Sequence, residues 1–123
     1  MPLKIRYLED EKIIHLISEG IITFETIKQA AILQAKYSVK YDTLKWLNTI
    51  SPIGSIVSIF DLYRIPELFH ILGVDKKTKL AIVSNDGNDK KRARFVETVC
   101  LNSGYNLKIF KHENEAKEWL QAV

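Results

Sequence analysis

The stretch SNDGNDKKRAR, residues 84–94, concentrates carboxylates, amides and cations between an apolar run and an amphipathic segment. Oxygen-rich turns can bind calcium, but an EF-hand loop needs oxygen ligands at fixed positions around a glycine at position six. With Gly87 in that role, positions one and twelve fall on Ile82 and Ala93. A phosphate-binding P-loop or a dinucleotide fingerprint needs further glycines, and Gly87 stands alone in this turn. The turn therefore matches none of these three sites.

The cations that follow this turn leave two interpretations open. Lys90, Lys91 and Arg92 fall in or near the first turn of a predicted helix, where the helix dipole favours anions. Asp86 and Asp89 can balance them on a solvated surface, which is the simpler interpretation because exposed charges cost little. Alternatively, the cations and the backbone N–H groups form a weak site for a phosphate or a carboxylate.

The remaining reactive side chains form no recognisable catalytic set. His15, His70 and His112 lie on different predicted elements, and no pair has the spacing of metal ligands. Cys100 is the only cysteine, and its place on an apolar stripe predicts a buried thiol. The acidic run 9–11 fits a hairpin turn. We therefore expect no catalysis, no metal and no cofactor.

Length, composition and charge indicate the class of protein. The 123 residues fit one domain, 1–123, and the 46% apolar and 27% charged residues are typical of a globular chain. The net charge of +3 is mild and the basic clusters lie beside acidic residues, so we expect no nucleic-acid binding. No apolar run approaches the roughly 18 residues of a membrane span, and the first residues lack an apolar signal core. These observations favour a cytoplasmic protein without integral membrane association.

The predicted elements follow the order ββαβαβαβα. Apolar and β-branched runs predict strands at residues 5–8, 13–17, 43–48, 80–83 and 106–110. Thr23 caps the first predicted helix, and the second runs from Ser55, with a kink at Pro66, to Gly73. Two more helices follow the last two strands. We predict a small α/β domain with a mostly parallel five-stranded sheet, an antiparallel edge hairpin and right-handed crossovers.

Two helical stripes are predicted to face the core. In the second helix the apolar positions at helical spacing are Ile56, Ile59, Phe60 and Tyr63. In the last helix they are Ala116, Trp119, Leu120 and Val123. We expect Trp119 to close the core against the last strand and to stabilise the fold.

Several segments resemble SpoIIAA-like proteins of the STAS/SEC14-type superfamily. These are GIITFETI, LAIVS, ARFVE and the ending LKIFKHENEAKEWL, and the order of elements agrees. The resemblance covers nearly the whole chain and implies the small α/β fold of that superfamily. It also implies a non-enzymatic binding or interaction domain, which in some relatives is a phosphorylation-controlled partner of a regulatory kinase.

In those relatives the phosphorylated serine lies in an Asp-Ser-Ser-Gly-like stretch between the third strand and the second helix. This chain has SPIGS at residues 51–55, without the aspartate and with the serine–glycine order changed. The resemblance therefore makes Ser55 a candidate phosphorylation site, whereas helix capping explains the same residue without a switch.

A ligand site is expected at the carboxyl ends of the parallel strands, because their loops and the helix N-termini meet at one edge. The candidate ligand-binding residues at this edge are Asn48, Ser51, Ser55, Ser84, Asn85 and Arg94. The leading hypothesis is a non-catalytic cytoplasmic binding or interaction domain of regulatory type with a protein partner. The alternatives are a carrier or sensor of a small anionic or amphipathic ligand and, third, an enzyme of unrecognised type.

Alternation along the strands predicts how the two faces of the sheet differ. The inward set is Ile5, Tyr7, Ile14, Leu16, Leu44, Trp46, Leu107 and Ile109. The outward set mixes polar with large apolar residues: Arg6, His15, Lys45, Lys108, Ile13, Ile17, Leu47 and Phe110. If most helices cover the inward face, this mixed surface predicts a homodimer through the outer sheet face. The competing expectation is that helices cover both faces.

Overall fold

The computed structural model describes residues 3–50, 58–84 and 90–122. Its strands are β1 (Leu3–Leu8), β2 (Ile13–Ser18), β3 (Lys45–Ile50), β4 (Lys79–Ser84) and β5 (Asn106–Phe110). Its helices are α1 (Phe24–Tyr41), α2 (Ile59–Tyr63), α3 (Ile65–Ile71), α4 (Lys90–Asn102) and α5 (Glu113–Gln121). The strands form one sheet in the order β1-β2-β3-β4-β5, in which only the β1–β2 pair is antiparallel. The predicted fold class is confirmed.

Helix α1 begins where the sequence predicts. The Thr23 hydroxyl accepts a hydrogen bond from the Thr26 backbone N–H, and the Thr26 hydroxyl accepts one from the Thr23 N–H. This reciprocal capping satisfies two N–H groups that a helix start leaves without partners. The helix ends at Asp42, whose φ of 50° turns the chain out of the helix.

The predicted second helix is two short helices, and its predicted apolar stripe is wrong at Phe60 and Tyr63. Ile56 lies outside the described residues. Ser58 caps α2, and Pro66 lies in the first turn of α3, where a proline is tolerated. Phe60 and Tyr63 are 76% and 61% exposed, and the core takes other residues of the segment: Leu62, Ile65, Leu68 and Phe69. The segment is apolar on more than one side, so helical spacing alone could not choose the buried one.

Strand β3 starts two residues later than predicted. The Thr43 hydroxyl donates to the Lys12 carbonyl, which ties Thr43 to the β1–β2 turn before the strand begins. Leu44, predicted to point inward, precedes β3 and is partly exposed. The other inward residues are buried or half-buried against the helices, as predicted.

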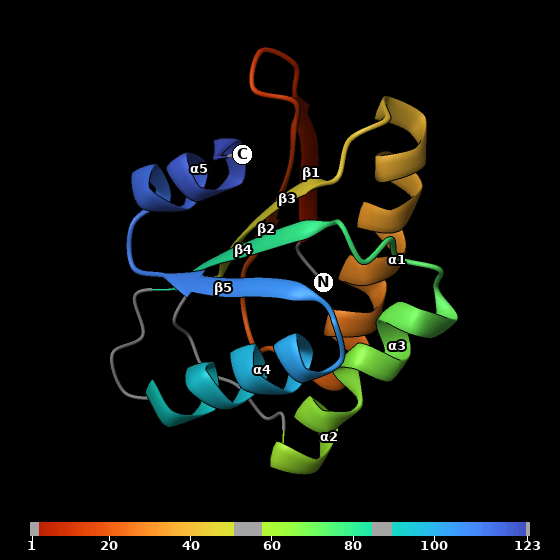
Figure 1. Ribbon diagram of the computed structural model, residues 1–123, viewed down its shortest axis with the longest axis vertical. Coiled ribbons are helices and arrows are strands. Elements are labelled where there is room, and N and C mark those ends of the chain that lie inside the picture. Colours follow the sequence, from red (N-terminus) through yellow and green to blue (C-terminus); the bar gives the residue numbers. More distant parts are fainter. Residues whose placement is uncertain (1–2, 51–57, 85–89, 123) are drawn as a thin grey trace.

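Helices cover both faces of the sheet (Figure 1). The larger cluster contains Ile14, Trp46 and Leu107 with residues of α1, α3 and α4. On the opposite face α5 lies alone across the strands and buries a smaller cluster: Ile13, Leu47, Ala81, Val83, Ala116 and Leu120. Ile13 and Leu47 are 0% exposed. Three of the four large apolar residues on which the predicted homodimer rested, Ile13, Leu47 and Phe110, therefore pack in the cluster that α5 covers, while Ile17 is half-buried. The competing expectation of helices on both faces is confirmed.

In the part of the chain that the structure describes, every helix is too short or too polar to cross a membrane.

Candidate functional site

The predicted ligand edge is only partly described. Three of its residues lie outside the described part of the chain: Ser51, Ser55 and Asn85. The phosphorylation of Ser55 therefore stays a prediction. Asn48 is half-buried on β3, and its side-chain oxygen accepts a hydrogen bond from the buried Gln34 on α1. Ser84 ends β4, and Arg94 is exposed on α4. A ligand-binding role for these residues stays a prediction.

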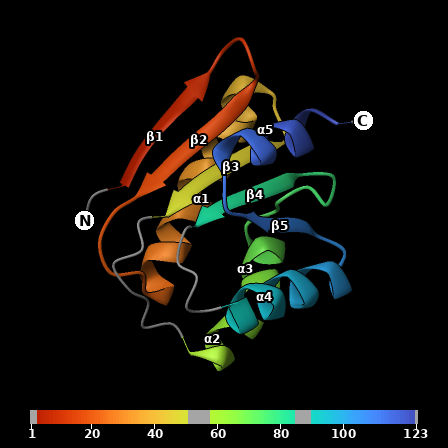
Figure 2. The same ribbon diagram turned by 90° about the vertical axis from the view of Figure 1, so that its left-hand side faces the viewer.

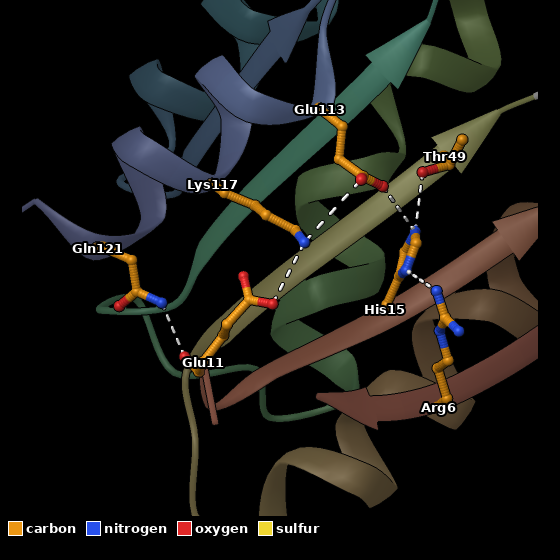
Figure 3. A network of polar contacts seen from close by, with 7 residues as sticks. All are labelled: Arg6, Glu11, His15, Thr49, Glu113, Lys117 and Gln121. Carbon is orange, nitrogen blue, oxygen red and sulfur yellow. Dashed lines mark hydrogen bonds and ion pairs between the residues drawn. The ribbon is translucent and has the colours of Figure 1, made fainter. Parts of the chain in front are cut away.

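A different set of polar residues converges where α5 crosses the sheet. We call this set the histidine cluster: Arg6, Glu11, His15, Thr49, Glu113, Lys117 and Gln121 (Figure 3). His15 Nε2 lies 2.9 Å from Thr49 Oγ1 and 3.8 Å from Glu113 Oε1, while Arg6 Nη2 lies 3.5 Å from His15 Nδ1. The imidazole is therefore contacted from β1, from β3 and from α5.

The rest of the cluster fastens α5 to the β1–β2 turn. Lys117 Nζ lies 3.2 Å from Glu11 Oε1 and 3.9 Å from Glu113 Oε2. Gln121 donates from Nε2 to the Glu11 carbonyl at 2.8 Å. On another strand, Lys79 Nζ donates to the Trp119 and Ala122 carbonyls at 3.1 and 2.7 Å, near the negative end of the helix dipole.

The contacts assign the proton of the His15 ring. Arg6 has only donors, so its contact requires Nδ1 to be the unprotonated nitrogen. The proton then lies on Nε2, which donates to Thr49 Oγ1. His15 is 3% exposed, and burial lowers its pKa below the usual range. Arg6 and Lys117 lower that pKa further, while Glu113 and Glu11 oppose the shift.

This geometry is unsuited to nucleophile activation by His15. A general base that activates a hydroxyl needs a free nitrogen facing the hydroxyl and a carboxylate behind the other nitrogen. Here the protonated nitrogen faces Thr49 and a guanidinium faces the other nitrogen. The cluster instead holds a neutral imidazole among ion pairs and orients α5.

Cys100 is buried as predicted. Its side chain is 0% exposed, and burial raises its pKa to about 12. At neutral pH the residue is therefore a protonated thiol, which is a poor nucleophile.

A second unusual region lies on the face of the sheet that α1, α3 and α4 cover, near the carboxyl ends of the strands (Figure 1). Its side chains link α2 to two other helices. The Tyr63 ring packs edge-on against the Phe95 ring of α4, with 4.9 Å between the ring centroids. The Arg64 guanidinium lies 4.3 Å from the centroid of the Phe24 ring of α1. Phe60 is one helical turn before Tyr63. We call the residues Phe24, Phe60, Tyr63, Arg64 and Phe95 the aromatic surface.

A shallow groove of about 270 Å3 lies at the other end of the strands. Its lining residues come from α3 and from the loops that precede β4 and β5: Pro66, Glu67, His70, Lys76, Ser103 and Tyr105. Small-molecule sites usually enclose roughly 300–1,000 Å3. The open groove is thus smaller than a usual ligand site, and it lies away from the edge that the sequence predicts.

Comparison with known proteins identifies the architecture. No family model matches the chain, and no curated protein matches its sequence. A crystal structure from Shewanella loihica PV-4, described as an uncharacterised protein of the DUF3478 family with a SpoIIAA-like fold, superposes with a TM-score of 0.58. The match covers 97% of this chain and 92% of that chain at 17% sequence identity. This chain has a SpoIIAA-like fold.

The SpoIIAA-like fold brings together residues that the sequence left apart. The sequence predicts His15 only as an outward-facing strand residue, and it predicts Phe60 and Tyr63 in the core. The sequence contains two signals of the cluster. One is a histidine inside the apolar run IIHLI, and the other is the pair Glu113 and Lys117 at i and i+4. They could not show that the two segments meet, because that contact depends on which face α5 covers.

Proposed function

We propose that this SpoIIAA-like domain is a non-catalytic interaction domain that binds a protein partner through the aromatic surface. The observation that carries the proposal is the exposure of two large rings, Phe60 and Tyr63, on one short helix. Its regulatory character follows from the resemblance to SpoIIAA-like proteins, and its cytoplasmic location stays a prediction.

Exposed aromatic rings are costly to leave in water and are enriched at the centres of protein interfaces, together with arginine. Phe60 and Tyr63 share one side of α2, since residues three apart are neighbours on a helix. Arg64 lies beside them and also faces Asp61 at 3.4 Å. Such a surface suits an apolar patch on a partner.

The partner's rim is expected to be acidic. Arg64 is the C-cap of α2, and Arg94 precedes Phe95 on α4. Both side chains are exposed. Guanidinium groups pair with carboxylates in a fork geometry that fixes orientation. We therefore expect carboxylates around the apolar centre of the partner's surface.

The non-catalytic part of the proposal is supported by the chemistry of the reactive groups. The His15 imidazole presents its proton to Thr49, and the Cys100 thiol is buried with a pKa of about 12. Neither group offers the free nucleophile and oriented base that covalent catalysis needs.

Affinity capture with matched variants tests the proposal. Immobilised protein is compared with a Phe60→Ser/Tyr63→Ser double variant and with Val39→Ser as control, since Val39 is 85% exposed on α1. We expect a specific protein to be captured by the parent and by the control, and at least about tenfold less by the double variant. Equal capture by all three would refute the role of the aromatic surface.

A further inference from the structure

The two margins of the sheet differ in how their backbones are protected. β1 and β5 each have a neighbouring strand on one side only. An edge strand presents unpaired N–H and C=O groups, so it can accept another strand unless side chains or neighbouring elements cover it.

The β5 margin is blocked by a side chain. Glu97 of α4 reaches over this edge, and its Oε1 accepts a hydrogen bond from the Ile109 backbone N–H at 2.8 Å. The outward N–H group of Ile109 therefore already has a partner. A chain arriving at β5 would have to displace this carboxylate.

The β1 margin lacks such a block among the residues that the structure describes: no described side chain bonds to the backbone of residues 3–8. In Figure 2 the described ribbon has no neighbour along the outer side of β1. Lys4 and Arg6 are exposed on one face of the strand, whereas Ile5 and Tyr7 are half-buried on the other. Tyr7 stacks on Tyr41 of α1 at 4.1 Å, which anchors β1 to the core.

We propose that β1 accepts an extended segment of a protein partner in which acidic and apolar residues alternate. Side chains of a strand alternate between the faces of a sheet, so such a segment would set its carboxylates beside Lys4 and Arg6. Its apolar residues would then lie beside Ile5 and Tyr7. Opposite charges that face each other across two strands favour strand pairing, and so do facing apolar side chains.

The same charges disfavour a second copy of this chain. In an antiparallel pair centred on Ile5, Lys4 would face the Arg6 of the other copy, and in one centred on Arg6 the two guanidinium groups would meet. Like charges directly opposite destabilise strand pairing. The edge lies away from the aromatic surface, since β1 is near the top and α2 at the bottom of both views (Figures 1 and 2). The inference therefore does not depend on the proposed function.

Peptide binding tests the inference directly. The probe is a capped peptide of about ten residues that alternates Glu and Val, long enough for one strand. One control peptide carries Lys in place of Glu, and another is N-methylated at alternate residues, which removes ladder donors. Lys4→Glu is the test variant because Lys4 lies outside the histidine cluster, and Lys108→Glu on β5 is its matched control.

We expect the Glu–Val peptide to slow amide hydrogen exchange in residues 3–8 and to bind Lys4→Glu at least about tenfold more weakly than the parent. Binding to Lys108→Glu should be unchanged, and both control peptides should fail to bind. The inference is overturned if the Glu–Val peptide does not bind at about 1 mM. Equal binding of either control peptide, protection confined to other elements, or a dimer formed through β1 would overturn it as well.

Discussion

The histidine cluster and the aromatic surface depart from ordinary patterning in opposite directions. The cluster buries an imidazole among charges, while the aromatic surface exposes rings to water. Among the described residues, Thr78 Oγ1 is the one buried side-chain polar atom without a partner, and it lies outside the cluster. The cluster is therefore satisfied within the domain, whereas the aromatic surface is not. A satisfied buried group contributes to stability, whereas the exposed rings are the basis of the proposed partner site.

The largest effect on stability is expected from removing the imidazole. His15→Ala would leave Thr49 and Glu113 without their common partner and would open a cavity under α5. We expect the free energy of unfolding to fall by about 2–4 kcal/mol. Denaturant unfolding measures this change, with the exposed His70→Ala as the control. A loss no larger than that of the control would show that the cluster does not hold the fold.

Trp119→Ala probes the apolar half of the same helix attachment. The ring packs against Phe110 at 5.7 Å and lies under Lys79 Nζ, but it is only half-buried. We expect a loss of about 2–3 kcal/mol, below the usual 3–5 kcal/mol for a fully buried aromatic residue. Hydrogen exchange should quicken most in α5. Unchanged thermal unfolding would mean that α5 is held by the polar contacts alone.

The pH dependence of stability should distinguish the cluster from the rest of the domain. Because the folded state lowers the pKa of His15, the unfolded state binds the proton more readily. Stability is therefore retained above the unfolded pKa of about 6.5 and lost as the pH falls below it, by up to about 1.4 kcal/mol per pH unit. His15→Gln should flatten this part of the profile. A parent and a variant with parallel profiles would contradict the buried neutral imidazole.

The smallest effect on stability is expected at the aromatic surface. Phe60→Ser removes a ring that is 76% exposed, so the free energy of unfolding should change by no more than about 0.5 kcal/mol. Thermal unfolding beside the Val39→Ser control measures it. A loss above about 2 kcal/mol would place Phe60 in the core and would remove the contrast between the two regions.

The fold was predictable because local signals agreed with one another. Thr23 caps α1, Gly73 follows α3 with a φ of 71°, and the strands alternate with helices as parallel crossovers require. The site was less predictable because it depends on which face of each helix packs against the sheet. Nothing in the sequence shows that Glu113 faces β2, or that Leu62 is buried while Phe60 is exposed. Both facts arise from packing between distant segments.

Photo-crosslinking at position 60 tests the central claim most directly. A photoreactive phenylalanine analogue replaces Phe60 in the source cells, and the same analogue at Val39 on α1, which is at least as exposed, serves as the control. The proposed interaction domain predicts a discrete crosslinked protein from position 60 and none from position 39. No adduct at position 60, or the same adducts from both positions, would contradict it.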